Sequence, residues 1–83
     1  MNRAKVDKNL HKISVRHLDK VGVLVHVFTV MAANGLNIQE LQNIVFAERE
    51  ACVANIMFSG DFSNVENILK EIKAHENILD VSS

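Results

Sequence analysis

The sequence predicts an α+β domain of the ferredoxin-like class, with the element order βαββαβ. Three observations predict it: segments with strand patterning, segments with apolar residues at helical spacing, and the order in which the two kinds alternate along 83 residues. Two right-handed β-α-β crossovers that share a hairpin place both helices on one face of a four-stranded antiparallel sheet. A chain of this length forms one domain.

The first strand is expected over residues 10–17. Ile13 and Val15 alternate there with polar residues, which is the two-residue period of a half-buried strand. Residues 1–9 are polar and fall outside the pattern. We expect them to form a tail or linker in front of a domain that spans residues 10–83.

The next segment is rich in β-branched residues, which favour a strand by propensity alone. Spacing favours a helix over residues 22–34, because four apolar side chains recur at i, i+3, i+4 and i+7 and so share one helical face. They are Leu24, Val27, Phe28 and Met31. We expect this face to be buried against the sheet. Asn34 and Gly35 then end the helix, since many helices stop at a residue in the left-handed conformation.

Residues 36–46 and 51–58 have the pattern of a hairpin, joined by a charged turn over residues 47–50. The apolar residues of the first arm change from one parity to the other, and a β-bulge near Gln39 and Glu40 reconciles them. The second arm is almost entirely apolar, as in a strand covered on both sides. We therefore expect it inside the sheet.

A second helix is expected to begin near Ser63 and to end near His75. Ser63 precedes Glu66 by three residues, which is the arrangement of a capping box. The apolar face of this helix is made of Val65, Ile68, Leu69 and Ile72.

Residues 77–83 form the expected closing strand, with Leu79 and Val81 on one side. The resulting domain leaves one sheet face and two sheet edges uncovered. Domains this small usually cover such surfaces with a partner or with the rest of a longer chain. We therefore expect a homodimer or a higher homo-oligomer.

The composition excludes several classes of protein. The net charge is -1 and the basic residues are scattered, so nucleic acid is not an expected partner. No apolar run reaches the roughly 20 residues of a membrane-spanning helix, and the first residues lack the pattern of a signal peptide. We expect no membrane association and a cytoplasmic location, which a single cysteine, Cys52, also fits.

The sequence lacks catalytic and metal-binding patterns. The four histidines have no zinc-ligand spacing, and Cys52 lies inside an expected strand as a small core residue. The three glycines are too dispersed for a dinucleotide-binding turn. We expect no catalytic residue, no metal and no cofactor in this chain.

Residues 17–24, H-L-D-K-V-G-V-L, form an elbow between the first strand and the first helix. A helix N-terminus presents free N–H groups that suit a carboxylate, and Asp19 just before it can pair with an ammonium group. Together they describe an α-amino acid as the ligand. The alternative is structural: Asp19 caps the helix, His17 is a satisfied strand-end histidine, and Asn37 suits the turn that it follows.

With N-G-L-N-I after one helix, the H-x-D-K-V-G-V-L elbow resembles the ACT domain, the amino-acid-sensing module attached to many biosynthetic enzymes. The resemblance covers residues 10–83. Within this family the chain is most similar to the C-terminal regulatory domain of D-3-phosphoglycerate dehydrogenase, also in the stretch E-L-Q-N-I-V-F-A-E-R-E-A-C-V-A. In such domains serine, the end product, binds between two ACT domains and slows the enzyme.

The resemblance implies roles for individual residues. His17 and Asp19 match the loop residues that contact serine, and Asn37 matches an asparagine that completes the pocket from the neighbouring subunit. Gly22 matches the glycine that lets the backbone approach the ligand. Val21 replaces the usual proline and leaves the loop less fixed. The implied ligand-binding residues are His17, Asp19, Val21, Gly22, Val23 and Asn37.

The implied function is that of a regulatory ACT domain, which senses L-serine for the catalytic domains of an NAD-dependent phosphoglycerate dehydrogenase, an oxidoreductase of serine biosynthesis. Two alternatives stay open. One is a dimerisation module of the same fold with no ligand. The other is a free-standing ACT protein that senses another amino acid.

Overall fold

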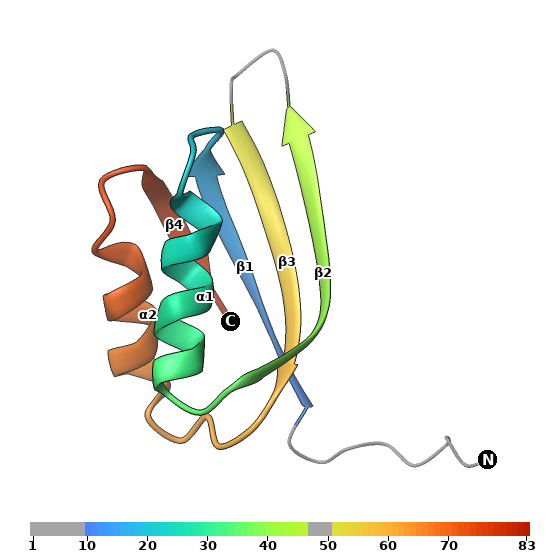
Figure 1. The fold of residues 1–83 in the computed structure, drawn as a ribbon, viewed down its shortest axis with the longest axis vertical. Coiled ribbons are helices and arrows are strands. Elements are labelled where there is room, and N and C mark those ends of the chain that lie inside the picture. The colour runs from blue at the N-terminus through green and yellow to red at the C-terminus, as the bar shows by residue number, and fades with distance from the viewer. Residues whose placement is uncertain (1–9, 47–50) are drawn as a thin grey trace, which may run out of the picture.

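The computed structural model describes residues 10–46 and 51–83 (Figure 1). The elements are β1 (Leu10–Leu18), α1 (Val23–Ala33), β2 (Asn37–Phe46), β3 (Ala51–Ser59), α2 (Val65–Lys73) and β4 (Ile78–Ser82). This is the predicted order, with both helices on one face of a four-stranded antiparallel sheet. Within the described ranges, neither helix is long and apolar enough to cross a membrane. The predicted tail over residues 1–9 and the turn over residues 47–50 lie outside these ranges.

The sheet order is β2-β3-β1-β4, so β3 and β1 are the inner strands. β1 buries Ile13, Val15 and His17 on the side that faces the helices. β3 alternates between buried and half-buried residues along its whole length. Its inner position confirms the prediction, although only its helix side is fully covered.

Helix α1 confirms the predicted segment but presents a different face to the sheet. Val23, Val27 and Met31 are buried, while Leu24 and Phe28 are only partly buried against the core. The prediction that Leu24 and Phe28 belong to the buried face is therefore wrong in part. Each follows a buried residue by one position, which turns its side chain about 100° around the helix axis.

The predicted glycine closes the end of α1. Gly35 has a φ of 73°. Its N–H donates to the carbonyl of Ala32 at 3.0 Å, and the N–H of Leu36 donates to the carbonyl of Met31 at 2.9 Å. This pair of bonds is the Schellman arrangement, which satisfies carbonyls that a helix end otherwise leaves free. The chain then enters β2 at once.

The hairpin of β2 and β3 contains the predicted bulge. Ile38 pairs with Phe58 and Glu40 pairs with Met57, which leaves Gln39 as the extra residue in β2. The bulge shifts the parity of the strand, so that the apolar residues before it and after it face the same side.

Helix α2 confirms the predicted apolar face, with Ile68 and Ile72 buried, but the predicted capping box is wrong. Asn64 occupies the N-cap position, and no side chain caps the first turn. The N–H of Ser63 instead donates to Asp61 Oδ1 at 3.0 Å. The Ser63 hydroxyl and this N–H both bond to the Asp61 carboxylate and lower its pKa. Because Ser63 is engaged in this turn, it does not cap the helix.

Strand β4 reaches the core in a way that strict alternation does not predict. Its pairing with β1 shifts by one residue between Arg16 and His17. Ile78 is 6% exposed and Leu79 is 41% exposed, while Val81 packs against the core. The prediction that Leu79 and Val81 lie on one side of the strand is therefore wrong, because the irregularity turns Ile78 inward and Leu79 outward.

Candidate functional site

The elbow between β1 and α1 is a tight, exposed turn. The N–H of Lys20 donates to the carbonyl of Leu18 at 2.9 Å, and Gly22 has a φ of 89°. This φ lies in the left-handed region, which other residues adopt at a cost. A Cβ on Gly22 would meet nothing within 4 Å. The turn therefore requires glycine for its backbone conformation and not for lack of space.

The N-terminus of α1 has no side-chain cap. Gly22 is the N-cap residue, and the first turn contains no acidic residue. The structural alternative in which Asp19 caps the helix is therefore wrong. The N–H groups of the first turn carry the positive end of the helix dipole, and Val21 beside them is fully exposed. An anion in solution can reach this end of the helix.

Asp19 adds a negative charge to the same elbow. The residue is exposed. Burial raises the pKa of the Cys52 thiol in β3, and the nearby charge of Asp19 raises it further. The helix N-terminus and Asp19 therefore offer opposite charges within one short turn. Such a pair complements a small zwitterion with a carboxylate and an ammonium group.

His17 lies at the end of β1 with both ring nitrogens engaged, and its side chain is 2% exposed. Nδ1 is 2.8 Å from the carbonyl oxygen of Leu18. Because a carbonyl only accepts, Nδ1 carries the proton of this bond. Nε2 is 3.2 Å from Asn43 Oδ1. This contact is a hydrogen bond when Nε2 is also protonated, or when the amide turns its NH₂ group to the ring. Asn43 thus holds the ring in place from β2.

The sequence prediction did not include Asn43, which lies 26 residues after His17. No short-range spacing links the two residues, and only the pairing of β1 and β2 with β3 brings them together. One signal was available. Asn43 is the polar residue between Leu41 and Val45 on the helix side of β2, a position that a purely apolar pattern would fill with another hydrophobic residue.

Cys52 pairs with His17 across β1 and β3, and with Asn43 the three residue types match a cysteine nucleophile and its base. The geometry does not support this chemistry. Cys52 is fully buried, and burial raises its pKa, whereas the nucleophile is a thiolate. Cys52 is a core residue, as predicted. Within the described part of the chain, no group of three or more His, Cys, Asp or Glu side chains is placed to hold a metal ion.

Asn37 lies far from the elbow of its own chain. It pairs with Ser59 at the start of β2, level with Leu10 on the other side of β3. β1 and β2 run in the same direction, so His17 and Asp19 lie at the opposite end of the sheet. The distance from Leu10 to His17 along the strand is roughly 23 Å. One copy of the chain therefore does not bring Asn37 to the elbow.

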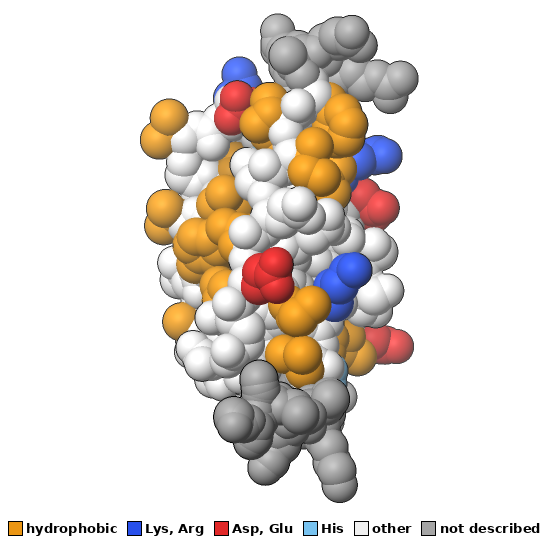
Figure 2. All heavy atoms as spheres, turned by 90° about the vertical axis from the view of Figure 1, so that its right-hand side faces the viewer, with side chains coloured by type: hydrophobic (Ala, Val, Ile, Leu, Met, Phe, Trp, Pro, Cys, Tyr) orange, Lys and Arg blue, Asp and Glu red, His pale blue; other side chains and the backbone are white. Residues whose placement is uncertain are grey.

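β2 is an edge strand with apolar side chains. Its large hydrophobic residues that are at least 39% exposed are Leu41, Ile44, Val45 and Phe46. Figure 2 shows hydrophobic side chains along this side of the molecule, with charged side chains among them. An unpaired apolar edge is a template for pairing with another strand.

A family model described as the AHAS small subunit-like ACT domain matches residues 13–80. The chain belongs to the ACT family. The match confirms the resemblance to ACT domains, while the narrower likeness to phosphoglycerate dehydrogenase stays a prediction. Among curated proteins, none matches this ACT domain.

Several solved structures share the fold. The small subunit of acetolactate synthase from Thermotoga maritima is 25% identical, with a TM-score of 0.72 over 88% of this ACT domain and 45% of that chain. The ACT domain from GTP pyrophosphokinase of Chlorobium tepidum is 18% identical, with a TM-score of 0.67 over 88% of this domain and 94% of that chain. A homoserine dehydrogenase from Thiobacillus denitrificans is 16% identical, with a TM-score of 0.74 over 89% of this domain and 16% of that chain. This ACT domain therefore spans less than half of the first and third of these proteins.

Proposed function

We propose that this ACT domain is a regulatory module that binds a free amino acid between two copies of the chain. The observation that supports the proposal is the N-terminus of α1, which no side chain caps, beside Asp19. The first-turn N–H groups suit the α-carboxylate of the ligand, and Asp19 suits its α-ammonium group. Gly22 leaves the backbone accessible, because it places no side chain over the turn.

A second copy brings its Asn37 to the end of the sheet where the elbow lies. When two β2 edges pair in antiparallel fashion, the start of one β2 lies beside the end of the other, which is the end of the sheet where the elbow lies. The same pairing satisfies the free N–H and C=O groups of the β2 edge. The proposed site combines His17, Asp19, Val21, Gly22 and Val23 of one copy with Asn37 of the second.

L-serine is the ligand that the resemblance to phosphoglycerate dehydrogenase favours, and the partner is then the catalytic part of that enzyme. The side-chain amide of Asn37 both donates and accepts hydrogen bonds, which suits the hydroxyl of serine. His17 joins the site by exchanging its contact with Asn43 for a ligand oxygen. Because the ligand lies between two copies, its binding stabilises the pair.

A second candidate is the regulatory part of an acetolactate synthase. The match to the AHAS small subunit-like model and the likeness to the Thermotoga maritima small subunit favour it. Val21 favours it as well, because this fully exposed residue of the elbow offers an apolar contact to a ligand side chain. In this case the ligand is an amino acid with an apolar side chain.

Thermal unfolding of the 83-residue chain, followed by far-UV circular dichroism, tests the proposal with L-serine, L-valine, D-serine and no ligand. A ligand at about 100 times its dissociation constant raises the free energy of unfolding by roughly 2.7 kcal/mol. For a domain of this size, the melting temperature then rises by about 10–20 °C. D-serine is the stereochemical control.

Variants assign the contacts. Asn37→Ala removes one hydrogen bond to the ligand and is expected to weaken binding by about 1–3 kcal/mol. The apo domain stays folded, because Asn37 is exposed. Asp19→Asn keeps the size of the side chain but removes the partner of the ammonium group, and it also reduces the shift. Asn67→Ala, at an exposed asparagine of α2, is the matched control and leaves the shift unchanged.

The outcomes separate the candidates. A shift with L-serine alone supports a phosphoglycerate dehydrogenase parent, and a shift with L-valine alone supports an acetolactate synthase. If no amino acid shifts the transition, or if the Asn37→Ala variant shifts as much as the parent chain, the sensing proposal is wrong. Analytical ultracentrifugation at protein concentrations on the order of tens of micromolar then shows whether the chain is a ligand-free dimerisation module.

A further inference from the structure

The loop between α2 and β4, residues 74–77, lies at the same end of the sheet as the elbow (Figure 1). A backbone hydrogen bond joins the two segments. The N–H of Leu18, the last residue of β1, donates to the carbonyl of Asn77 at 2.9 Å. β3 lies on the other side of β1, so this bond, and not the pairing with β3, holds the N–H of Leu18. Asn77 therefore anchors β1 at the point where the chain turns toward α1.

The side chain of His75 in turn holds Asn77. The N–H of Asn77 donates to His75 Nδ1 at 3.0 Å. Because this N–H is the donor, Nδ1 carries no proton in this bond, and the ring proton is on Nε2. The backbone of the same turn is closed separately by Ile78, whose N–H donates to the carbonyl of His75 at 3.1 Å. The His75 ring is thus the acceptor that fixes the Asn77 peptide.

The hydrogen bonds continue into the elbow. The carbonyl of Leu18 accepts the N–H of Lys20 at 2.9 Å, and it lies 2.8 Å from Nδ1 of His17. Two hydrogen bonds, from Asn77 to the His75 ring and from Leu18 to Asn77, therefore separate His75 from the residue that both groups of the elbow contact. A change at the His75 ring can reach the proposed ligand site along this path.

The ring of His26 in α1 lies beside His75, with 5.1 Å between the ring centroids. His26 Nε2 is 3.1 Å from the carbonyl oxygens of Glu71 and Ile72 in the last turn of α2. Because carbonyls only accept, Nε2 donates to them, and a second proton on this ring goes to Nδ1. A second proton therefore leaves the hydrogen bonds of His26 in place, whereas at His75 it removes the acceptor of Asn77.

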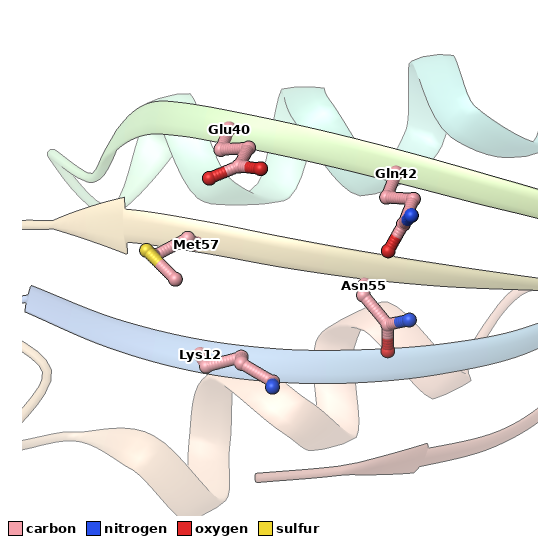
Figure 3. Close-up of a pocket in the computed structure, with 5 residues that line it drawn as sticks. All are labelled: Lys12, Glu40, Gln42, Asn55 and Met57. Atoms are coloured by element: carbon pink, nitrogen blue, oxygen red, sulfur yellow. The ribbon is translucent and has the colours of Figure 1, made fainter.

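The charged groups around His75 are in contact with water. His75 itself is half-buried, and His26 is the titratable residue of α1. The charged residues of α2 near its end, of the loop, of β4 and of the elbow are all exposed; they are Glu71, Lys73, Glu76, Asp80, Asp19 and Lys20. Lys12 and Glu40 line the hollow of Figure 3, on the sheet face away from both helices, so their charges do not face His75.

We propose that His75 is a positioning residue for the proposed amino-acid site and makes the affinity of this site depend on pH. A histidine ring ordinarily gains its second proton as the pH falls from about 8 to about 5. A proton on Nδ1 turns the acceptor into a donor, so the bond from Asn77 is lost. Leu18 is then held less firmly, and the elbow presents Asp19 and the first N–H groups of α1 to the ligand less precisely.

The coupling stands on the hydrogen bonds of the loop, while its effect on a ligand rests on the proposed function. We expect an effect the size of about one hydrogen bond, which is about a three- to tenfold change in the dissociation constant. The bond between the backbones of His75 and Ile78 does not involve the ring. The loop and the domain therefore stay folded when His75 is protonated.

Isothermal titration calorimetry with L-serine and with L-valine, at about pH 8 and about pH 5, tests the effect on the ligand. Two substitutions separate positioning from a general structural role. His75→Asn keeps an acceptor without a titrating ring, because an asparagine side chain accepts the N–H two residues on. It is expected to bind as the parent chain does at the higher pH. His75→Ala has no acceptor and is expected to bind about three- to tenfold more weakly there.

The ratio of the dissociation constants at the two pH values isolates His75. His17 belongs to the proposed site, so its own contribution to this ratio is common to the parent chain and to the variants. We expect the ratio to be about three- to tenfold smaller in His75→Asn and in His75→Ala than in the parent. His11→Asn is the matched control and keeps the parent ratio, because His11 lies at the other end of β1, where its ring packs near Phe58 and Phe62.

NMR titration of the ligand-free chain tests the coupling without a ligand. The amide signals of Asn77 and Leu18 are expected to move along the titration curve of the His75 ring, and to stay in place in His75→Asn. Amide signals that do not follow the His75 ring would overturn the proposal. So would a His75→Asn variant that keeps the parent ratio, or a His75→Ala variant that binds as tightly as the parent at the higher pH. If no amino acid binds at either pH, the proposed function is wrong, and the amide signals still decide whether His75 positions the elbow.

Discussion

Two neighbouring residues of β4 test the irregularity in this strand. Ile78→Ala removes a side chain that is 6% exposed and packs in the core. Such a change costs about 2–5 kcal/mol, and we expect the lower half of this range because β4 is an edge strand whose neighbours can relax into the space. Leu79→Ala removes a side chain that is 41% exposed. We expect it to cost about 0.5 kcal/mol or less, as is usual away from the core.

Urea unfolding followed by far-UV circular dichroism measures both free energies, since the chain has no Trp or Tyr to serve as a fluorescent probe. A difference of about 2 kcal/mol between the variants corresponds to roughly 8–16 °C in melting temperature. Equal costs, or a larger cost for Leu79→Ala, would refute the reasoning. Strict alternation would then hold in β4, and Leu79 would lie on the same side as Val81, as the sequence pattern predicted.

Gly22→Ala is expected to lower the free energy of unfolding by about 1–2 kcal/mol, because it places a Cβ at a φ of 89°. Gly22→Asn is expected to lower it less, since asparagine tolerates this backbone region. Equal melting temperatures for the two variants would contradict this account. Met31→Ala should lower the free energy of unfolding by about 2–5 kcal/mol, and Phe28→Ala, at a half-buried residue, by less than about 3 kcal/mol. If urea unfolding gave the larger loss for Phe28→Ala, the helix face predicted from spacing would be favoured. Burial, and then the charge of Asp19, raise the pKa of Cys52 above the ordinary 9.0. The stability that the protonated thiol contributes is therefore complete below pH 9.0 and is lost as the pH rises through the folded-state pKa. Cys52→Ala should flatten this loss, as measured by urea unfolding on either side of pH 9.0.

Helix α1 shows how far spacing determines a structure. Its β-branched residues favour a strand, yet the recurrence of apolar residues and the glycine stop predicted a helix, and the structure confirms it. The buried face was harder to predict, because the stripe of Val23 and Val27 and the stripe of Leu24 and Phe28 are equally apolar. The position of the helix on the sheet chooses between them, and this position depends on contacts with distant segments.

The two strand irregularities differ in whether the sequence predicts them. The bulge at Gln39 was predictable, because the apolar residues around it change parity in the sequence. The irregularity in β4 left no such mark, because Ile78, Leu79 and Val81 are all apolar and either alternation is possible. Only the pairing with β1 decides which of them faces the core.

The candidate site was predictable where it is local. The elbow and Gly22 follow from a short stretch of sequence, and the structure gives them the expected strand-to-helix position. The contact between His17 and Asn43 joins β1 and β2, the strands on either side of β3, and has no local signal in the sequence. The proposed role of Asn37 requires a second copy of the chain, so neither the sequence nor one copy of the fold determines it.

The sheet order also bears on how the chain folds as it leaves the ribosome. β2 and β3 are neighbours in sequence, so their hairpin can form quickly from local contacts. β1 is made first but pairs only with β3 and β4, and these contacts require the closure of long loops. A nascent chain therefore carries β1 without its partners until almost the whole domain has been synthesised. Chaperones and proteases that act on emerging chains meet the apolar side of this strand during that interval, before the sheet and its helices cover it.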